Sequence, residues 1–279
     1  MAYRTILVSL NDATRLEQAL ALTADLQEEH GAHIIGLFVI PAMQIYPTVG
    51  MEITPDVYEG HRAFFKDQAE KVKKRFNDMI AREGLSAELR IIDSASPLAA
   101  DMVIDHGRYA DLIVVTQVDR EGEEGVELDF DERVVMEAGR PVLVLPRADL
   151  PKKLAKVLVG WNGTRESARA LFDALPILKR ADEATVVWVD PQRERDMASV
   201  LAGADIAAIL ARHGVKVTSE PLATAGLNAG EALLQRARDG GADMLVMGAY
   251  GHSRMREFVF GGATRHVLRN AKIPVLMSH

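Results

Sequence analysis

A glycine-rich segment near the C-terminus has the residue types and the spacing of an anion site. It reads GAYGHSRMREFVFGGATRHVL from Gly248 to Leu268, with a G-x-x-G pattern and, nine residues later, a glycine pair. Glycine lets the backbone turn sharply and approach a ligand without a Cβ in the way. The free N–H groups and the dipole of a helix that starts here favour a phosphate. The residues predicted to form this cradle are Gly248, Gly251, Gly261, Gly262, Ala263 and Thr264, the last as a hydroxyl donor.

Charge in the same segment favours an anion. His252, Arg254, Arg256 and Arg265 give it a positive balance that only Glu257 relieves. The alternative is that the glycines merely punctuate a turn between two strands. His252 and His266 fit no metal-ligand spacing, so surface or capping roles are the simpler interpretation for both.

Two similar halves must position this segment. The stretch YRTILVSLNDATRLEQALALTADL from Tyr3 has a counterpart in AKVLVGWNGTRESARALFDALPIL from Ala155. Further downstream, ADLIVV matches ADMLVM and RPVLVLP matches IPVLMS. We therefore predict domains at residues 1–148 and 153–279, joined by the polar stretch RADLPKK.

Each half alternates apolar strands with helices. In the second half the strands are expected near 155–160, 184–190, 215–220, 243–248 and 273–277, and the helices near 165–180, 195–213, 227–239 and 262–270. Short continuous apolar runs indicate parallel strands covered on both faces. The predicted fold is α/β, with two tandem doubly wound open parallel sheets of five strands each, in the order 3-2-1-4-5. In such sheets ligands bind where the strand order reverses, which is between the first and fourth strands.

The first half differs from the second in two places. It carries about twenty extra residues, PAMQIYPTVGMEITPDVYEG at 41–60, whose prolines suggest a long surface loop or lid. Its counterpart of the glycine segment lacks G-x-x-G and carries eight carboxylates against one arginine from Asp119 to Glu132. We expect this stretch to be a solvated acidic loop that repels a nucleotide.

Composition excludes several classes of protein. The chain of 279 residues has no cysteine, which excludes disulfides, thiol catalysis and cysteine-bound zinc. No apolar run approaches the length of a membrane helix, and the net charge of −7 argues mildly against nucleic-acid binding. We expect a cytoplasmic protein with neither a membrane nor a nucleic-acid partner.

The glycine spacing, the helix that follows it and the final PVL strand together resemble the nucleotide-binding signature of the universal stress protein family. The whole chain looks like a tandem member with two such domains. The resemblance implies that the second half binds ATP, ADP or AMP, with Mg²⁺ possible alongside the nucleotide. It also implies that the two final strands pair in an intramolecular pseudo-dimer, and that two chains can form a homodimer.

The resemblance assigns roles to individual residues around this crevice. Asn162, which follows Gly160 and Trp161 after the first strand, stands where the family commonly has Asp and brings no charge to a metal ion. Val189 and Met247 fall along the adenine wall, and Gly262 stands where the family usually has Ser or Thr. Beside the nucleotide, Trp161 is interpreted as a packing residue, Thr164 as a helix cap, and Asp190 as a turn cap or a ribose contact.

The predicted function is nucleotide-dependent sensing or regulation by the second half of the chain. Phosphoryl transfer needs a positioned nucleophile and metal ligands, and the sequence shows no Walker A pattern and no obvious base. One alternative is a nucleotide-free scaffold that uses the proline-rich insertion to bind a partner. A weaker one is slow ATP hydrolysis.

Overall fold

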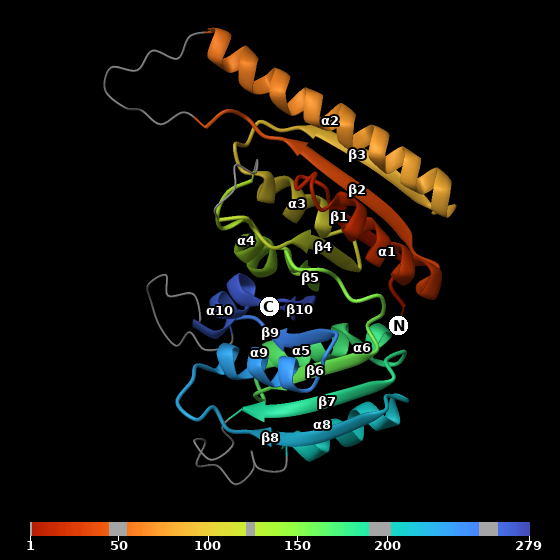
Figure 1. Cartoon of the computed structure of the whole chain (residues 1–279), viewed down its shortest axis with the longest axis vertical. Helices are drawn as coiled ribbons and strands as arrows, with labels where there is room; N and C mark the ends of the chain where they lie inside the picture. Colours follow the sequence, from red (N-terminus) through yellow and green to blue (C-terminus); the bar gives the residue numbers. More distant parts are fainter. Residues whose placement is uncertain (1, 45–54, 121–125, 190–201, 251–261) are drawn as a thin grey trace. The chain divides into compact units, whose positions relative to one another are not determined.

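The computed structural model describes residues 2–44, 55–120, 126–189, 202–250 and 262–279. Contacts divide the chain into two compact units, Tyr3–Val134 and a second unit built on Val135–His279. In both, strands alternate with helices (Figure 1). The predicted domain boundary near residues 148–153 rests on the sequence repeat and stays a prediction.

The first unit contains a parallel sheet in the order β3-β2-β1-β4. Its strands are β1 (Thr5–Ser9), β2 (His33–Ile40), β3 (Ala87–Asp93) and β4 (Leu112–Thr116). Its helices are α1 (Leu16–His30), α2 (Pro55–Glu83) and α3 (Ala99–Gly107), and α4 (Phe130–Glu137) begins in it. Leu7, in the central strand β1, lies between Ile35 of β2 and Ile113 of β4. The order agrees with the first four positions that the sequence predicts.

Helix α2 corrects one expectation for the first half. It begins at Pro55, so the last six residues of the segment 41–60 are helix and not loop. Residues 45–54 of that segment lie outside the described part of the chain. The buried residues of α2 recur at helical spacing, which explains why it lies along β2 and β3 (Figure 1). They are Phe65, Ala69, Val72, Phe76 and Met79.

The second unit has the strand order β5-β10-β9-β6-β7-β8. Its strands are β5 (Val142–Leu145), β6 (Lys156–Trp161), β7 (Glu183–Val189), β8 (Val217–Leu222), β9 (Met244–Gly248) and β10 (Val275–Ser278). Its helices are α5 (Arg165–Asp173), α6 (Leu175–Leu178), α8 (Ala202–Arg212), α9 (Ala229–Asp239) and α10 (Gly262–Asn270). Strands β6 to β10 are parallel, and their arrangement confirms the predicted 3-2-1-4-5 order. The helix expected at 165–180 is two helices, with Pro176 in the first turn of the second.

The final strands of the two halves pair with each other. Strand β5 runs antiparallel to β10, with Leu143 opposite Leu276, and both of these side chains are fully buried. This is the strand pairing that the resemblance implies. Each of the two apolar strands gains a hydrogen-bonding neighbour through it.

Helices cover both faces of the second unit's sheet. Helices α5 and α8 lie on one face, and α9 and α10 lie on the other (Figure 1), as right-handed crossovers require for this strand order. A Cβ on Gly230 of α9 would lie 2.4 Å from the carbonyl oxygen of Ala263 in α10, so these two helices approach closely. In the described part of the chain, no helix has both the length and the apolar character needed to cross a membrane.

Candidate functional site

The turn after β6 forms one side of the predicted crevice. The Oδ1 atom of Asn162 accepts hydrogen bonds from the backbone N–H of Thr164 at 3.3 Å and from its hydroxyl at 2.9 Å. Gly163, between them, has a φ of +73°, which favours glycine. Because Oδ1 is used by the turn, the Nδ2 protons are what Asn162 can offer a ligand.

Helix α5 begins directly after this turn. The hydroxyl of Thr164 accepts a hydrogen bond from Ser167 N at 3.3 Å, which confirms the predicted helix cap. The end of β9 packs against the same helix turn. A Cβ on Gly248 would lie 2.5 Å from Ser167 N and 2.6 Å from the carbonyl carbon of Glu166. Glycine at 248 is therefore required by packing, whatever binds nearby.

Residues on three neighbouring strands lie together at the carboxyl edge of the sheet. Gly160 of β6 is the register partner of Met247 in β9, and Val189 is the last residue of β7. Met247 is buried and Val189 is half-buried. The predicted apolar wall thus lies beside the turn that carries Asn162.

Thr264 joins the segment after β9 to helix α10. Its hydroxyl oxygen accepts a hydrogen bond from Tyr250 N at 3.1 Å, and Thr264 is only 3 % exposed. Tyr250 has a φ of +60°, which is uncommon for a residue with a side chain. Thr264 therefore ties the two described ends of the glycine segment together, and its contact with a phosphate stays a prediction.

Helix α10 begins at the exposed residue Gly262. In the described part of the chain, no atom of another segment lies within 4 Å of a Cβ built on Gly262. The N–H groups of Gly262 and Ala263 belong to the first turn of a nine-residue helix, where the dipole favours an anion. Four other residues of the predicted site, Gly251, His252, Arg254 and Gly261, lie outside the described residues.

His279 is a contact of this segment that the sequence reasoning missed. Its Nδ1 atom lies 3.1 Å from the carbonyl oxygen of Ala249, and its ring meets the ring of Tyr250 edge-on at 6.2 Å. Strand β10 brings it there, because Ala249 N donates to Ser278 O at 2.9 Å. No local motif around His279 indicates this contact, which depends on the pairing of β9 with β10.

The first half has a carboxylate where the second half has Thr264. Matching Val142 with Val275, each of which follows a proline, places Asp131 at the position of Thr264. Oδ2 of Asp131 accepts a hydrogen bond from Val118 N at 3.4 Å, much as Thr264 accepts one from Tyr250 N. Asp131 is 1 % exposed, and burial raises its pKa to about 6 although two backbone N–H groups donate to it.

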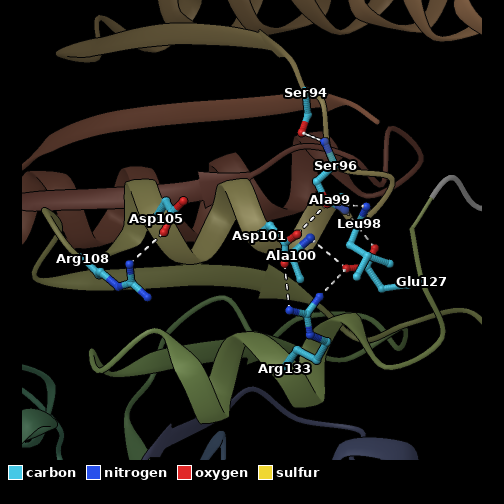
Figure 2. Close-up of polar contacts among 10 residues, drawn as sticks. All are labelled: Ser94, Ser96, Leu98, Ala99, Ala100, Asp101, Asp105, Arg108, Glu127 and Arg133. Carbon is cyan, nitrogen blue, oxygen red and sulfur yellow. Dashed lines mark hydrogen bonds and ion pairs between the residues drawn. The ribbon is translucent and has the colours of Figure 1, made fainter. Parts of the chain in front are cut away.

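A second carboxylate of the first half caps helix α3 (Figure 2). The two oxygens of Glu127 accept hydrogen bonds from Ala99 N at 3.0 Å and from Ala100 N at 2.8 Å. Nη1 of Arg133 lies 3.8 Å from Oε1 of Glu127, and Nη2 of Arg133 lies 2.8 Å from Oδ1 of Asp101. The Ser96 hydroxyl, together with Arg133, lowers the pKa of Asp101.

For the described end of the stretch, these contacts correct the expectation of a solvated acidic loop; Glu121, Glu123 and Glu124 lie outside the described residues. At the end of that stretch, Asp131 and Glu132 are buried within α4, and the Glu127 side chain is only 11 % exposed. Arg120 lies 3.3 Å from Glu132. Here the acidic residues are structural, and an incoming phosphate would meet negative charge already fixed in place.

Sequence comparison identifies relatives of this chain. The model of the Universal stress protein family matches residues 153–279. Universal stress protein Slr1230 of Synechocystis sp. is 30% identical over 145 residues, which are 52% of this chain and 49% of that protein. The match thus spans about half the length of this curated relative.

Structure comparison extends the likeness to nearly the whole chain. A universal stress protein from Archaeoglobus fulgidus has a TM-score of 0.72 at 17% identity, over 98% of this chain and 97% of that one. A protein of unknown function from Pseudomonas aeruginosa has a TM-score of 0.60 at 16% identity, over 99% and 92%. At these identities the likeness shows the fold.

Proposed function

This chain belongs to the universal stress protein family through residues 153–279, and from that premise we propose that its second half binds one adenine nucleotide. The nucleotide is ATP, ADP or AMP, and its occupancy regulates the chain in a cytoplasmic stress response. The first half binds none. The proposal rests on family membership together with the contrast between matched positions of the two halves.

That contrast is the observation that carries the proposal. At the start of the last helix the second half has Gly262, Ala263 and Thr264, whereas the first half has Asp129, Phe130 and Asp131. An exposed first turn without carboxylates suits a phosphate. The same position in the first half holds a buried carboxylate that already accepts two backbone N–H groups.

The described residues fit an adenine nucleotide at the carboxyl edge of β6, β7 and β9. Val189 and Met247 would contact the adenine, Asn162 Nδ2 would donate to the ribose or a phosphate, and the first turn of α10 would bind phosphate oxygens. We keep Gly251, His252, Arg254 and Gly261 in the proposed site on the strength of the sequence pattern. Asn162 brings no charge, so Mg²⁺ would depend mainly on the phosphates for ligands.

We propose binding in preference to catalysis. The described residues include no cluster of three His, Asp or Glu side chains that could hold a metal ion. Hydrolysis would also need a positioned base beside the nucleotide. A phosphate-release assay separates slow hydrolysis from binding.

Two substitutions at Gly262 test the proposed site. Because a Cβ there meets no other described segment, neither Gly262→Asp nor Gly262→Ser should disturb packing. The Asp variant places a carboxylate at the phosphate position and should weaken ATP binding at least about 10-fold. The Ser variant restores the hydroxyl that the family usually has and should bind at least as tightly as the wild type.

The measurements are mass spectrometry of small molecules released from the purified chain, and thermal shift with AMP, ADP and ATP, each with and without Mg²⁺. We expect an adenine nucleotide in the released fraction and stabilisation on adding it back. A nucleotide-free protein that no nucleotide stabilises would favour the scaffold alternative. Equal ATP affinity in the Asp variant and the wild type would remove α10 from the site.

A further inference from the structure

A cavity of about 530 Å³ opens in the first unit, beyond the carboxyl ends of β2 and β3. The segment after β2, the first turns of α2 and the segment after β3 line it. The lining residues that matter here are Ile40, Pro41, Met43, Arg62 and Asp93. A volume of this size is typical of a pocket for a small molecule.

This cavity is separate from the crevice between β1 and β4. None of its described lining residues belongs to β1, to β4 or to the segments that follow them. Asn11, just after β1, closes the gap to β2, because its Nδ2 donates to Val39 O at 2.7 Å and its Oδ1 accepts from Val39 N at 3.1 Å. The cavity is therefore a candidate site independent of the proposed nucleotide site.

Backbone hydrogen bonds hold the base of the cavity in place. Ser94 N donates to Ile40 O at 2.9 Å, and Ala42 N donates to Ser96 O at 2.9 Å. The pairing of β2 with β3 thus continues past the ends of both strands and fixes the two lining segments against each other. On this side of the cavity a ligand would meet a preformed wall, which lowers the entropic cost of binding.

One cation and one anion lie side by side on this surface. Arg62 of α2 forms an ion pair with Asp93 at the end of β3, and their side chains are 41% and 45% exposed. A purely anionic ligand would gain Arg62 but meet Asp93, and a purely cationic ligand would face the reverse problem. A zwitterion satisfies both charges, with its carboxylate beside Arg62 and its ammonium group beside Asp93.

Part of the remaining cavity wall can take an apolar group. Ile40, Pro41 and Met43 supply aliphatic and thioether surface. On the α2 side of the cavity, Tyr58 is half exposed. The ring of His61 packs against the ring of Phe65, with the two ring centroids 4.9 Å apart. A small zwitterion with an apolar or aromatic side chain matches this combination of surfaces.

We propose that this cavity binds a free hydrophobic α-amino acid. Binding should be weak, roughly high micromolar to millimolar, because half-exposed ion pairs contribute little. Such an affinity suits a site that responds to changes in the concentration of a metabolite. The first half would then carry a ligand site of its own, of a different kind from the one proposed for the second half.

Four related compounds test the charge requirement on the intact wild-type chain. L-phenylalanine is the zwitterion, 3-phenylpropionate keeps only the carboxylate, 2-phenylethylamine keeps only the ammonium group, and N-acetyl-L-phenylalanine amide has neither charge. NMR titration should show L-phenylalanine binding about 3- to 5-fold more tightly than each compound that lacks one charge, and at least that much more tightly than the uncharged amide. Equal affinity for all four, or no binding of L-phenylalanine up to roughly 10 mM, would overturn the proposal.

Substitutions locate the binding to this cavity. Arg62→Gln and Asp93→Asn should each weaken L-phenylalanine binding about 3- to 5-fold, while Arg82→Gln, on an exposed arginine of the same helix, should leave it unchanged. Unchanged binding in both cavity variants would also refute the assignment. ATP titrations of the same variants should match the wild type, so loss of nucleotide binding alone counts against the proposed function and not against this cavity.

Discussion

Asp131 and Thr264 occupy matched positions in the two halves, and each accepts an N–H from the segment after the fourth strand of its half. A hydroxyl at this position leaves the neighbourhood neutral, whereas a carboxylate buries a charge. The residue at this one position thus decides whether a further negative charge, such as a phosphate, can lie near the same backbone arrangement. This difference supports confining nucleotide binding to the second half.

Asp131 should make stability depend on pH. Its pKa is about 6 in the folded chain and about 4 in an unfolded one, so the folded state holds a proton that the unfolded state releases between these values. Its stabilising contribution is full below about pH 4 and is lost as the pH rises through 6. Relative to Asp131→Asn, the wild type should lose roughly 2–3 kcal/mol of unfolding free energy between pH 4 and pH 7.5.

Urea denaturation at a series of pH values measures this difference. Asp129→Asn is the matched control, because Asp129 is exposed and lies two residues away. Its pH profile should follow that of the wild type. Parallel profiles for Asp131→Asn and the wild type would mean that Asp131 is ionised at little cost in the folded chain.

Prediction of single residues from sequence succeeded where the signal is local. Thr164 precedes a helical pattern and caps the helix, as predicted. Asp131 was missed because it stands in a run of acidic residues, and such runs are usually solvated. The sequence did contain a usable signal. Asp131 stands at helical spacing from the buried stripe of α4 and its continuation, which consists of Val134, Val135 and Ala138.

At the scale of elements, the two halves cap equivalent helices differently. Helix α9 is capped by its own Asn228, whose side chain accepts from Glu231 N. Helix α3 has no cap of its own and receives Glu127 from the segment before α4. The cap of α3 therefore ties two segments together, while the cap of α9 is local.

Glu127→Ala should destabilise the chain by about 1–2 kcal/mol, because two N–H groups at the start of α3 lose their acceptor and Arg133 loses a neighbouring charge. Glu59→Ala, at an exposed position of α2, should change stability by no more than about 0.5 kcal/mol. Urea denaturation at pH 7 compares the two. Equal effects would show that the cap of α3 contributes nothing measurable.

The close packing of β9 against α5 leads us to expect that Gly248 cannot be replaced without a loss of stability. Gly248→Ala should cost about 1–3 kcal/mol, because its Cβ would overlap the backbone of Glu166 and Ser167. Gly60→Ala is the opposite case. Gly60 stands within helix α2, and no described atom lies near a Cβ built on it, so the alanine should raise the free energy of unfolding by about 0.5–1 kcal/mol. Thermal unfolding of both variants checks the pair, and a tolerated alanine at 248 would contradict the close approach of α5.

Most elements could be predicted from the sequence, because short apolar runs and helical spacing repeat in both halves. The start of α2 could not, since Pro55 was interpreted as part of a loop. Proline suits the first turn of a helix, where its missing N–H is not needed. The same ambiguity hid Pro176, which lies inside the single helix expected at 165–180 and stands in the first turn of α6.

At the scale of the whole molecule, the repeat in the sequence predicted the repeat in the fold. The pairing of β5 with β10 is the one that the family resemblance implies, and it gives each of two apolar final strands a neighbour. What the repeat could not predict is the cavity beside α2. It depends on Arg62 and Asp93, which are 31 residues apart and belong to no motif.

The most direct test of the central claim is the number of nucleotides bound per intact chain, measured by titration calorimetry with ATP and Mg²⁺. We expect one saturable site per chain in the wild type and at least about 10-fold weaker binding in Gly262→Asp. Two sites per chain, no detectable binding at micromolar protein, or a Gly262→Asp variant that binds as the wild type does would contradict the claim.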